Sequence, residues 1–453
     1  MNSTLNNEEN DENNTANSKN NQETIESLTE IVDELYKFRD YYFEEHPLDN
    51  ALEKSKDIEN KLQNTLDILN RNAEYAVIEH RARYFYLKGR ALNVLPKYNK
   101  DAEDLLLKAV KLDPKLVEAW NELGECYWKK GNLKEAKNCF VGALNYTKNK
   151  ISLRSLSMLA RQEICNNKDE MLSNIEKGLT LAKEAVQMDP QDGLSWVVLG
   201  NAHLSAFFGI SQNPKTLKLC LSAYSQAERD IIARSTPDLH YNKAITLKYE
   251  EEFLQALESF SLASNYDPTW EPPQQKKKEL IKYLNNVSEM VKTSGKMKVK
   301  RLKQIVQSID NKQLGPYSGG KYTSSGGQAV KLDEVLLSNL SVGLNEEKVM
   351  LGKVVCSIYN EDKVPFTFCM VDKQGECCAV TVFNIAETKG VIIGDSVAIP
   401  EPFITEIDFS FEENTFKFRL IRVETPCVLV VNGKKLGKEY QAGVQMSIFR
   451  KFD

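Results

Sequence analysis

The sequence predicts an α-solenoid of stacked helix pairs followed by a small all-β barrel. Two observations carry this prediction: a pattern of large and small apolar residues recurs through the first part of the chain, and the apolar period changes from 3.6 to 2 after Val330. The chain has 453 residues, 42% of them apolar and 27% charged, which suffices for two or three domains with full cores. Its net charge of −5 disfavours nucleic-acid binding over the whole surface but allows a local basic patch.

The amino-terminal part is predicted to pass from a disordered tail into two helices. Residues 1–22 are rich in Asn, Glu and Asp and hold too few apolar side chains to form a core, so we expect a disordered tail. Residues 23–72 then contain two amphipathic stretches, around Thr24–Glu45 and Ala51–Asn70, whose apolar spacing is typical of helices.

The repeat is clearest in "EAWNELGECYWKKGNLKEAKNCFVGAL", which begins at Glu118. Counted from Val117, its large and small apolar residues occupy positions 4, 7, 8, 11, 20, 24 and 27, which are Trp120, Leu123, Gly124, Tyr127, Ala136, Phe140 and Ala143. The same template restarted at Pro237 gives Ala244, Leu247, Ala256, Phe260 and Ala263. The small residues let two antiparallel helices approach closely, and the large ones fill the gaps between successive pairs.

Five such helix pairs are predicted within a solenoid that spans residues 73–293. Each pair leaves an apolar face that only a neighbour can bury, so the pairs must stack into a superhelix with a concave inner surface. A further helix at Gln274–Thr293 is predicted to cap the carboxy-terminal end. The repeats are placed at 80–114, 117–148, 150–190, 193–232 and 237–268, the first and third being degenerate.

Residues 294–328 are predicted to form a basic and Gly/Ser-rich linker. The run "KTSGKMKVKRLKQ" carries six basic residues and no acid, and can be interpreted as a solvated hinge or as a nuclear address. The following "LGPYSGGKYTSSGGQ" contains Gly315, Gly320 and Lys321 in the spacing of a phosphate-binding loop. Tyr322 stands where that loop needs Ser or Thr, and no apolar strand precedes it, so a linker is favoured.

Residues 329–453 are predicted to form the barrel. The segments "VMLGKVVCSIY", "PFTFCMVD", "CCAVTVFNI", "DSVAIPEP", "TFKFRLIRVE" and "CVLVVNG" alternate as strands do, and Gly or Pro punctuates most gaps. The order of these segments resembles an oligonucleotide-binding (OB) fold. Phe366, Phe368 and Phe383 could stack on bases or lie in the core, so single-strand binding and protein docking both remain open.

No motif of catalytic chemistry is present, and we expect a non-catalytic protein without a cofactor. The sequence has no nucleophile elbow, HExxH, dinucleotide fingerprint or kinase signature. Its nine cysteines form no CxxC pair and its four histidines are far apart, so a metal site is not expected and the cysteines are interpreted as core thiols in a reducing compartment. No stretch was expected to span a membrane and no signal peptide is seen, which predicts the cytoplasm or the nucleus.

The inner surface of the solenoid is the predicted binding site. Positions 2, 5, 9, 12 and 13 of each first helix face it, and they supply acids, bases and amides that suit an extended peptide bearing both charge signs. The side chains so placed include Asn121, Glu125, Lys129, Arg161, Asn201, Asp238 and Tyr241.

The chain as a whole resembles the tetratricopeptide repeat protein 5 (Strap) family, which joins tetratricopeptide repeats to an OB-fold domain. The resemblance rests on "ELYKFRDYYFE", "KGRALNV", "LLLKAVKLDPKLVEAWNELGE", "TPDLHYNKA", "VPFTF" and "GDSVAIPEP". It implies an adaptor that reads the amino-terminal Met-Arg-Glu-apolar peptide of nascent tubulin at the ribosome and promotes decay of tubulin mRNA.

The resemblance also implies roles for individual residues. Arg161 and Asp238 are implied to contact the peptide, and Glu271 stands one position early for a second acidic contact. Lys108 and Lys111, three apart on one helix, are implied to touch ribosomal RNA. The alternative that the family offers is a stress-responsive scaffold, nuclear and cytoplasmic, for acetyltransferase coactivators and an actin-nucleating cofactor, with a barrel that binds chromatin partners or single-stranded nucleic acid.

Overall fold

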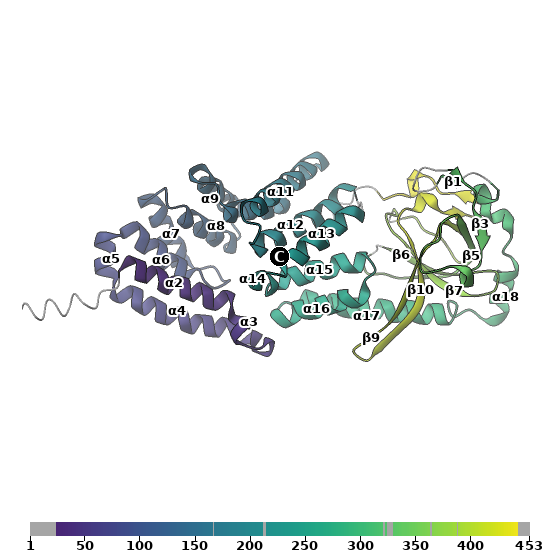
Figure 1. Cartoon of the computed structure of the whole chain (residues 1–453), viewed down its shortest axis with the longest axis horizontal. Helices are drawn as coiled ribbons and strands as arrows, with labels where there is room; N and C mark the ends of the chain where they lie inside the picture. Colours follow the sequence, from purple (N-terminus) through teal and green to yellow (C-terminus); the bar gives the residue numbers. More distant parts are fainter. Residues whose placement is uncertain are drawn as a thin grey trace, which may run out of the picture. The chain divides into compact units, whose positions relative to one another are not determined.

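The structure, a computed structural model, describes residues 24–165, 167–211, 214–319, 322–323, 329–362, 365–386 and 388–442 (Figure 1). The predicted tail at 1–22 lies outside these residues. The chain divides into two compact units, one made of Met1–Glu251 with Leu262–Glu271 and the other of Glu252–Ser261 with Pro272–Asp453. The predicted fold class, a helical solenoid followed by an all-β domain, is confirmed.

The first unit is a stack of helices. Its helices, in chain order, are α2 (Ile25–Asp40), α3 (Tyr42–Glu45), η1 (Leu48–Leu52), α4 (Lys54–Arg71), α5 (Ala73–Glu79), α6 (Arg81–Leu92), α7 (Lys100–Leu112), α8 (Val117–Lys129), α9 (Leu133–Tyr146), α10 (Lys150–Gln162), α11 (Lys168–Met188), α12 (Gly193–Ala206), η2 (Phe207–Ser211), α13 (Pro214–Ala227), α14 (Ile231–Arg234) and α15 (Pro237–Tyr249). The following helix, α16 (Phe253–Tyr266), is divided between the units.

The helices pack as the repeat pattern predicts. α6 packs on α7, α8 on α9, α10 on α11 and α12 on α13, and consecutive pairs also touch. The glycine at position 8 of the template is required by this packing, because a Cβ on Gly124 would lie 2.8 Å from the ring of Phe140. Phe140 is 1% exposed, so the small and large residues of one repeat meet in the core.

The expectation that no stretch is apolar enough to span a membrane was wrong for one segment. Gly193–Ile210, which covers α12 and most of η2, has a mean hydropathy of 1.3 over 18 residues. Because 72% of this segment is buried inside the protein, it has the character of a core helix.

The second unit combines helices with a β-sheet. Its remaining helices are α17 (Glu271–Lys292, from Pro272 on), α18 (Val299–Gln307), η3 (Asn311–Tyr317), η4 (Leu337–Asn339), η5 (Pro426–Val428) and η6 (Lys438–Tyr440). The strands are β1 (Tyr322–Thr323), β2 (Ala329–Val330), β3 (Asp333–Val335), β4 (Gly343–Leu344), β5 (Lys348–Ile358), β6 (Phe366–Val371), β7 (Cys377–Val382), β8 (Ser396–Pro400), β9 (Phe403–Phe411), β10 (Asn414–Val423), β11 (Val430–Val431) and β12 (Lys434–Lys435). Within the predicted linker, therefore, α18 and η3 form, and Leu314 and Tyr317 of η3 are buried.

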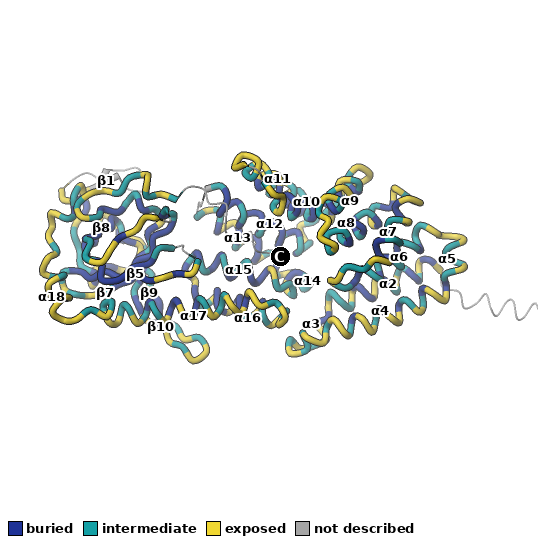
Figure 2. The backbone as a smooth tube through the Cα atoms, turned by 180° about the vertical axis from the view of Figure 1, so that it is seen from behind, coloured by how far each residue is buried: buried dark blue, intermediate teal, exposed yellow. Residues whose placement is uncertain are grey.

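The main sheet runs in the order β12-β11-β8-β5-β6-β7-β10-β9-β4, with β3 beside β5. β10 pairs with β7, and β3 with β5, in parallel, and the other pairs are antiparallel. A core of Phe368, Val380, Ile421 and their neighbours fills one side of the sheet. The strand residues are mostly buried, whereas the tip of the β9–β10 hairpin is exposed (Figure 2).

Helix α17, predicted to cap the solenoid, packs on the sheet of the second unit. Tyr283 and Thr367 share a hydrogen bond of 2.9 Å between their hydroxyls. Lys276 pairs with Asp362, in the turn after β5, at 2.7 Å and with Glu279 of its own helix at 2.8 Å. The turn after α17 lies against β5, because a Cβ on Gly295 would stand 3.1 Å from the Cβ of Cys356.

Candidate functional site

The side-chain oxygen of Asn201 joins three helices of the first unit, α12, α13 and α15. Tyr224 of α13 is fully buried, and its ring lies against Gly200 of α12. The ring fits there because Gly200 has no side chain, and a Cβ on it would lie 2.4 Å from the ring. The Tyr224 hydroxyl donates to Asn201 Oδ1 at 2.7 Å, and Asn242 Nδ2 of α15 donates to the same oxygen at 3.1 Å. Among the described residues, Asn242 Oδ1 is buried and accepts no hydrogen bond.

Arg161, at the end of α10, places a guanidinium beside this tyrosine without a carboxylate partner. Its Nε donates to Ser157 O at 3.1 Å, and its side chain packs over Gly178 of α11. No described Asp or Glu lies within 4 Å of it. Burial lowers the pKa of the guanidinium to about 10, against a smaller opposing effect of Tyr224. A half-buried cation without a carboxylate partner is suited to bind an anion through its N–H donors.

Asp238, in the first turn of α15, supplies the opposite charge. The residue is exposed, and among the described residues no hydrogen bond or ion pair uses its carboxylate. Its pKa is raised, first by the protein atoms that displace water around the carboxylate and second by the charge of Asp267. Burial is the main cause that raises the pKa of Tyr224, and the smaller effects include a lowering by Arg161 and a raising by Asp238. We call Arg161, Asn201, Tyr224, Asp238 and Asn242 the Tyr224 cluster.

Tyr241 and Glu271 lie near the same end of this unit. Tyr241 is 6% exposed, and its ring centroid is 4.9 Å from that of Trp270, so it acts mainly as a packing residue. Glu271 is the first residue of α17 and is exposed. Asp267, in the segment "DPTW", was not predicted as a site residue. Its charge contributes to the raised pKa of Asp238.

The other predicted inner-surface residues are engaged in contacts within the unit. Asn121 is buried, donates to Asn149 Oδ1 at 3.2 Å and accepts from the Ser152 hydroxyl at 2.6 Å, so it ties α8 to α10. Lys129 pairs with Glu125 at 2.8 Å and donates to Asn93 O at 2.6 Å.

Beside them lies a largely buried carboxylate that the sequence did not single out. Glu122 of α8 accepts from the Tyr36 hydroxyl at 3.2 Å and from Asn93 Nδ2 at 3.0 Å, and Arg90 Nε lies 3.5 Å away. Burial and, second, the charge of Glu125 raise the pKa of Glu122 to about 7, although Asn93 and Arg90 act to lower it. The only signal in the sequence was its place in the repeat helix, which does not show which way it points.

Lys108 and Lys111 are both exposed on α7, as a contact with a phosphate backbone requires. Lys108 Nζ lies 5.9 Å from the centre of the Phe85 ring, which holds its aliphatic part against α6.

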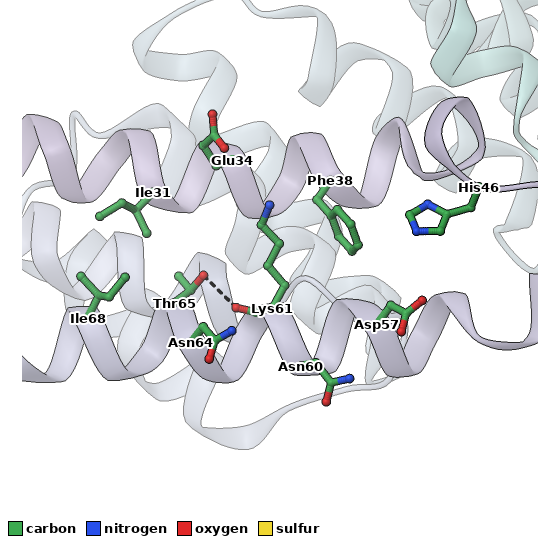
Figure 3. Close-up of a pocket in the computed structure, with 10 residues that line it drawn as sticks. All are labelled: Ile31, Glu34, Phe38, His46, Asp57, Asn60, Lys61, Asn64, Thr65 and Ile68. Carbon is green, nitrogen blue, oxygen red and sulfur yellow. Dashed lines mark hydrogen bonds between the residues drawn. The ribbon is translucent and has the colours of Figure 1, made fainter. Parts of the chain in front are cut away.

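A separate open pocket of about 620 Å³ lies between α2 and α4 (Figure 3). Ile31, Phe38 and Ile68 form its apolar part, and Lys61 Nζ stands 4.7 Å above the Phe38 ring. None of the predicted site residues lines it. Within the part of the chain that the structure describes, no group of three or more His, Cys, Asp or Glu side chains is arranged to hold a metal ion.

Comparisons with known proteins agree with this architecture. The model of the tetratricopeptide repeat protein 5 OB fold domain matches residues 331–445, and the tetratricopeptide repeat model matches residues 117–150. Tetratricopeptide repeat protein 5 of Homo sapiens is 46% identical over 419 residues, which are 92% of this chain and 95% of that protein. The Mus musculus protein is 46% identical over 93% of this chain and 96% of its own length.

Solved structures match the helical part less closely. YrrB, described as a TPR protein with an unusual peptide-binding site, is 21% identical with a TM-score of 0.31, over 45% of this chain and 97% of its own. TTC0263 from Thermus thermophilus is 17% identical with a TM-score of 0.33, over 40% and 89%. The identity and coverage of the curated relatives show that the chain belongs to the tetratricopeptide repeat protein 5 family, a repeat scaffold for protein interactions with an OB domain.

Proposed function

We propose that the Tyr224 cluster binds the amino-terminal Met-Arg-Glu-apolar peptide of nascent tubulin, and that this cytoplasmic adaptor, held at the ribosome, promotes decay of tubulin mRNA. The observation that carries the proposal is the pair of opposite charges, Arg161 and Asp238, which both act electrostatically on Tyr224 and have no ion-pair partner among the described residues. Family membership supports it independently.

The chemistry of the cluster fits the peptide residue by residue. The Arg161 guanidinium suits the glutamate of the peptide, and the Asp238 carboxylate suits its arginine, each through charge-assisted hydrogen bonds. Asn201 and Asn242 carry amides of the kind that bond an extended backbone, and the unpaired Oδ1 of Asn242 suits a peptide N–H. Binding would return to Arg161 and Asp238 the partners that they lack in the free protein.

Removing the charges one at a time, from the peptide and from the protein, tests the assignment. Peptides Met-Arg-Glu-Ile, Met-Ala-Glu-Ile and Met-Arg-Ala-Ile, labelled at the carboxyl end, are titrated against the full chain and its Arg161→Ala and Asp238→Ala variants. We expect each variant to lose about tenfold or more in affinity for Met-Arg-Glu-Ile, since a truncated buried charge pair typically costs ~2 kcal/mol or more. Arg161→Ala should be insensitive to loss of the peptide glutamate, and Asp238→Ala to loss of the peptide arginine.

The matched control is Arg154→Ala. Arg154 is on the same helix, but its guanidinium is already paired with Asp192 at 2.9 Å, so we expect unchanged peptide affinity. Equal binding of Met-Arg-Glu-Ile by the wild-type chain and both cluster variants would refute the assignment.

Attachment to the ribosome is proposed to use Lys108 and Lys111. Both are exposed, and two phosphate contacts give a binding constant that falls with salt with a slope of about −1.4 to −1.8 on logarithmic axes. Co-sedimentation with ribosomes translating tubulin, with Lys108→Gln/Lys111→Gln beside the wild type, measures this slope. Co-sedimentation that neither substitution weakens would assign the contact elsewhere.

A further inference from the structure

Strand β9 has a long backbone edge that no other strand of the described chain covers. The sequence pattern did not predict this strand, which spans Phe403–Phe411 and pairs along its whole length with β10. On its other side only the two-residue strand β4 pairs with it, at Phe403 and Ile404. From Thr405 to Phe411 no strand of the described residues pairs with that side, although α17 contacts the hairpin tip through Lys277–Glu412 and Asn285–Asn414.

The hydrogen-bond pattern shows which groups the open edge presents. Asn345 N–H donates to Pro402 O at 3.2 Å, and Gly343 pairs with Ile404, so even-numbered residues direct their backbone groups away from β10. The two-residue turn at Glu412, whose φ is 52°, joins Phe411 to Asn414 and is consistent with odd-numbered residues bonding to β10. The next outward N–H and C=O groups along this row are those of Glu406, Asp408 and Ser410.

The side chains beside this row differ on the two faces of the strand. Glu406, Asp408 and Ser410 are exposed on one face, and half of the Asp408 side chain is accessible. Ile407 and Phe409 are on the other face, with the Phe409 ring 5.1 Å from that of Phe416 on β10. Val342 and Leu344, at the start of the open row, are 63% and 51% exposed. A strand laid on this edge would meet Glu406 and Asp408, the latter paired with Lys417 at 2.5 Å, on one face and the apolar side chains of Ile407 and Phe409 on the other.

We propose that the open edge of β9 binds an extended peptide of a partner protein in which basic residues alternate with apolar ones. The peptide continues the row that β4 begins, and its backbone bonds to Glu406, Asp408 and Ser410. Because side chains alternate along a strand, its Lys or Arg residues fall beside Glu406 and Asp408 and its apolar residues beside Ile407 and Phe409.

The experiment uses the full chain and a fluorescein-labelled nonapeptide of alternating lysine and valine, measured by fluorescence anisotropy at low salt. The decisive pair of variants is Ser410→Pro and Thr415→Pro. These two residues are paired across the hairpin and share a hydrogen bond of 3.0 Å between hydroxyls. Ser410→Pro removes an N–H from the β9 edge, whereas Thr415→Pro removes one from the β10 edge, with the same loss to the hairpin.

We expect Ser410→Pro to weaken binding about tenfold or more and Thr415→Pro to leave it within about twofold of the wild type. Glu406→Gln with Asp408→Asn should weaken it about fivefold, and a glutamate-valine nonapeptide should not bind. Arg161→Ala should bind like the wild type, which separates this edge from the Tyr224 cluster. Absence of wild-type binding, equal loss in both proline variants, or pairing of two copies of the chain through this edge in place of the peptide would each overturn the proposal.

Discussion

Replacement of Glu122 by Gln should make the protein more stable at neutral pH and less dependent on pH. The Glu122 side chain is 14% exposed and its pKa is raised from 4.5 to about 7 by burial and by Glu125. An acid whose folded pKa is raised binds its proton more tightly in the folded state, so its favourable contribution is present below pH 4.5 and is lost as the pH rises to about 7. With ~1.4 kcal/mol per pKa unit, the loss is at most about 3 kcal/mol.

Glutamine imitates the protonated acid and keeps the bonds from Tyr36 and Asn93. Arg90 retains Asp33 and the ring of Tyr36, 4.3 Å from its guanidinium carbon. Urea unfolding of both full-length chains, followed by circular dichroism from pH 5 to pH 8, measures the effect. Groups common to both chains cancel in the difference, which should grow in favour of Glu122→Gln as the pH rises. Parallel curves, or a variant that is less stable at pH 8, would refute the reasoning.

Two further substitutions test the Tyr224 cluster. Arg161→Met should raise the free energy of unfolding by ~1 kcal/mol, because it removes an unpaired and largely desolvated cation, while it abolishes binding of Met-Arg-Glu-Ile; thermal unfolding and the peptide titration report the two effects, and a destabilised variant would show that the guanidinium has a structural partner. Gly200→Ala should cost about 1–3 kcal/mol, because its Cβ would stand 2.4 Å from the Tyr224 ring; a melting temperature equal to that of the wild type would mean that the ring moves aside freely.

The sequence predicted those parts of the fold that depend on spacing along the chain. Gly124 and Phe140 belong to one repeat, so their meeting follows from the template. Strand β9 was not predicted, although its polar and apolar residues alternate from Glu406 to Phe411 as they do in a half-exposed strand that pairs with a neighbour such as β10. α17 was assigned to the solenoid because the apolar spacing of an amphipathic helix does not show which surface the helix packs against.

The candidate site was predictable only in part for the same reason. The positions of Asn201 and Asp238 in the template predicted them as site residues. Tyr224 occupies a core position of the template, and the direction in which its hydroxyl points depends on tertiary packing. Asn121 shows the converse, since an amide at an inner-surface position is consumed by contacts between helices. Residue spacing does not predict which polar side chains bond to one another, and this pairing decides which of them can bind a ligand.

Because α17 and the turn after it pack against the sheet, they determine where a separate fragment of the β-domain should begin. A fragment beginning at residue 329 would leave Thr367 without the Tyr283 hydroxyl and would remove the turn at Gly295 from Cys356. The Cys356 thiol would then lose this cover, with Cys369 directly opposite it on the neighbouring strand. In air such molecules cross-link to one another, and the resulting oligomers would be mistaken for natural self-association. Beginning the fragment before α17 keeps the Cys356 thiol shielded.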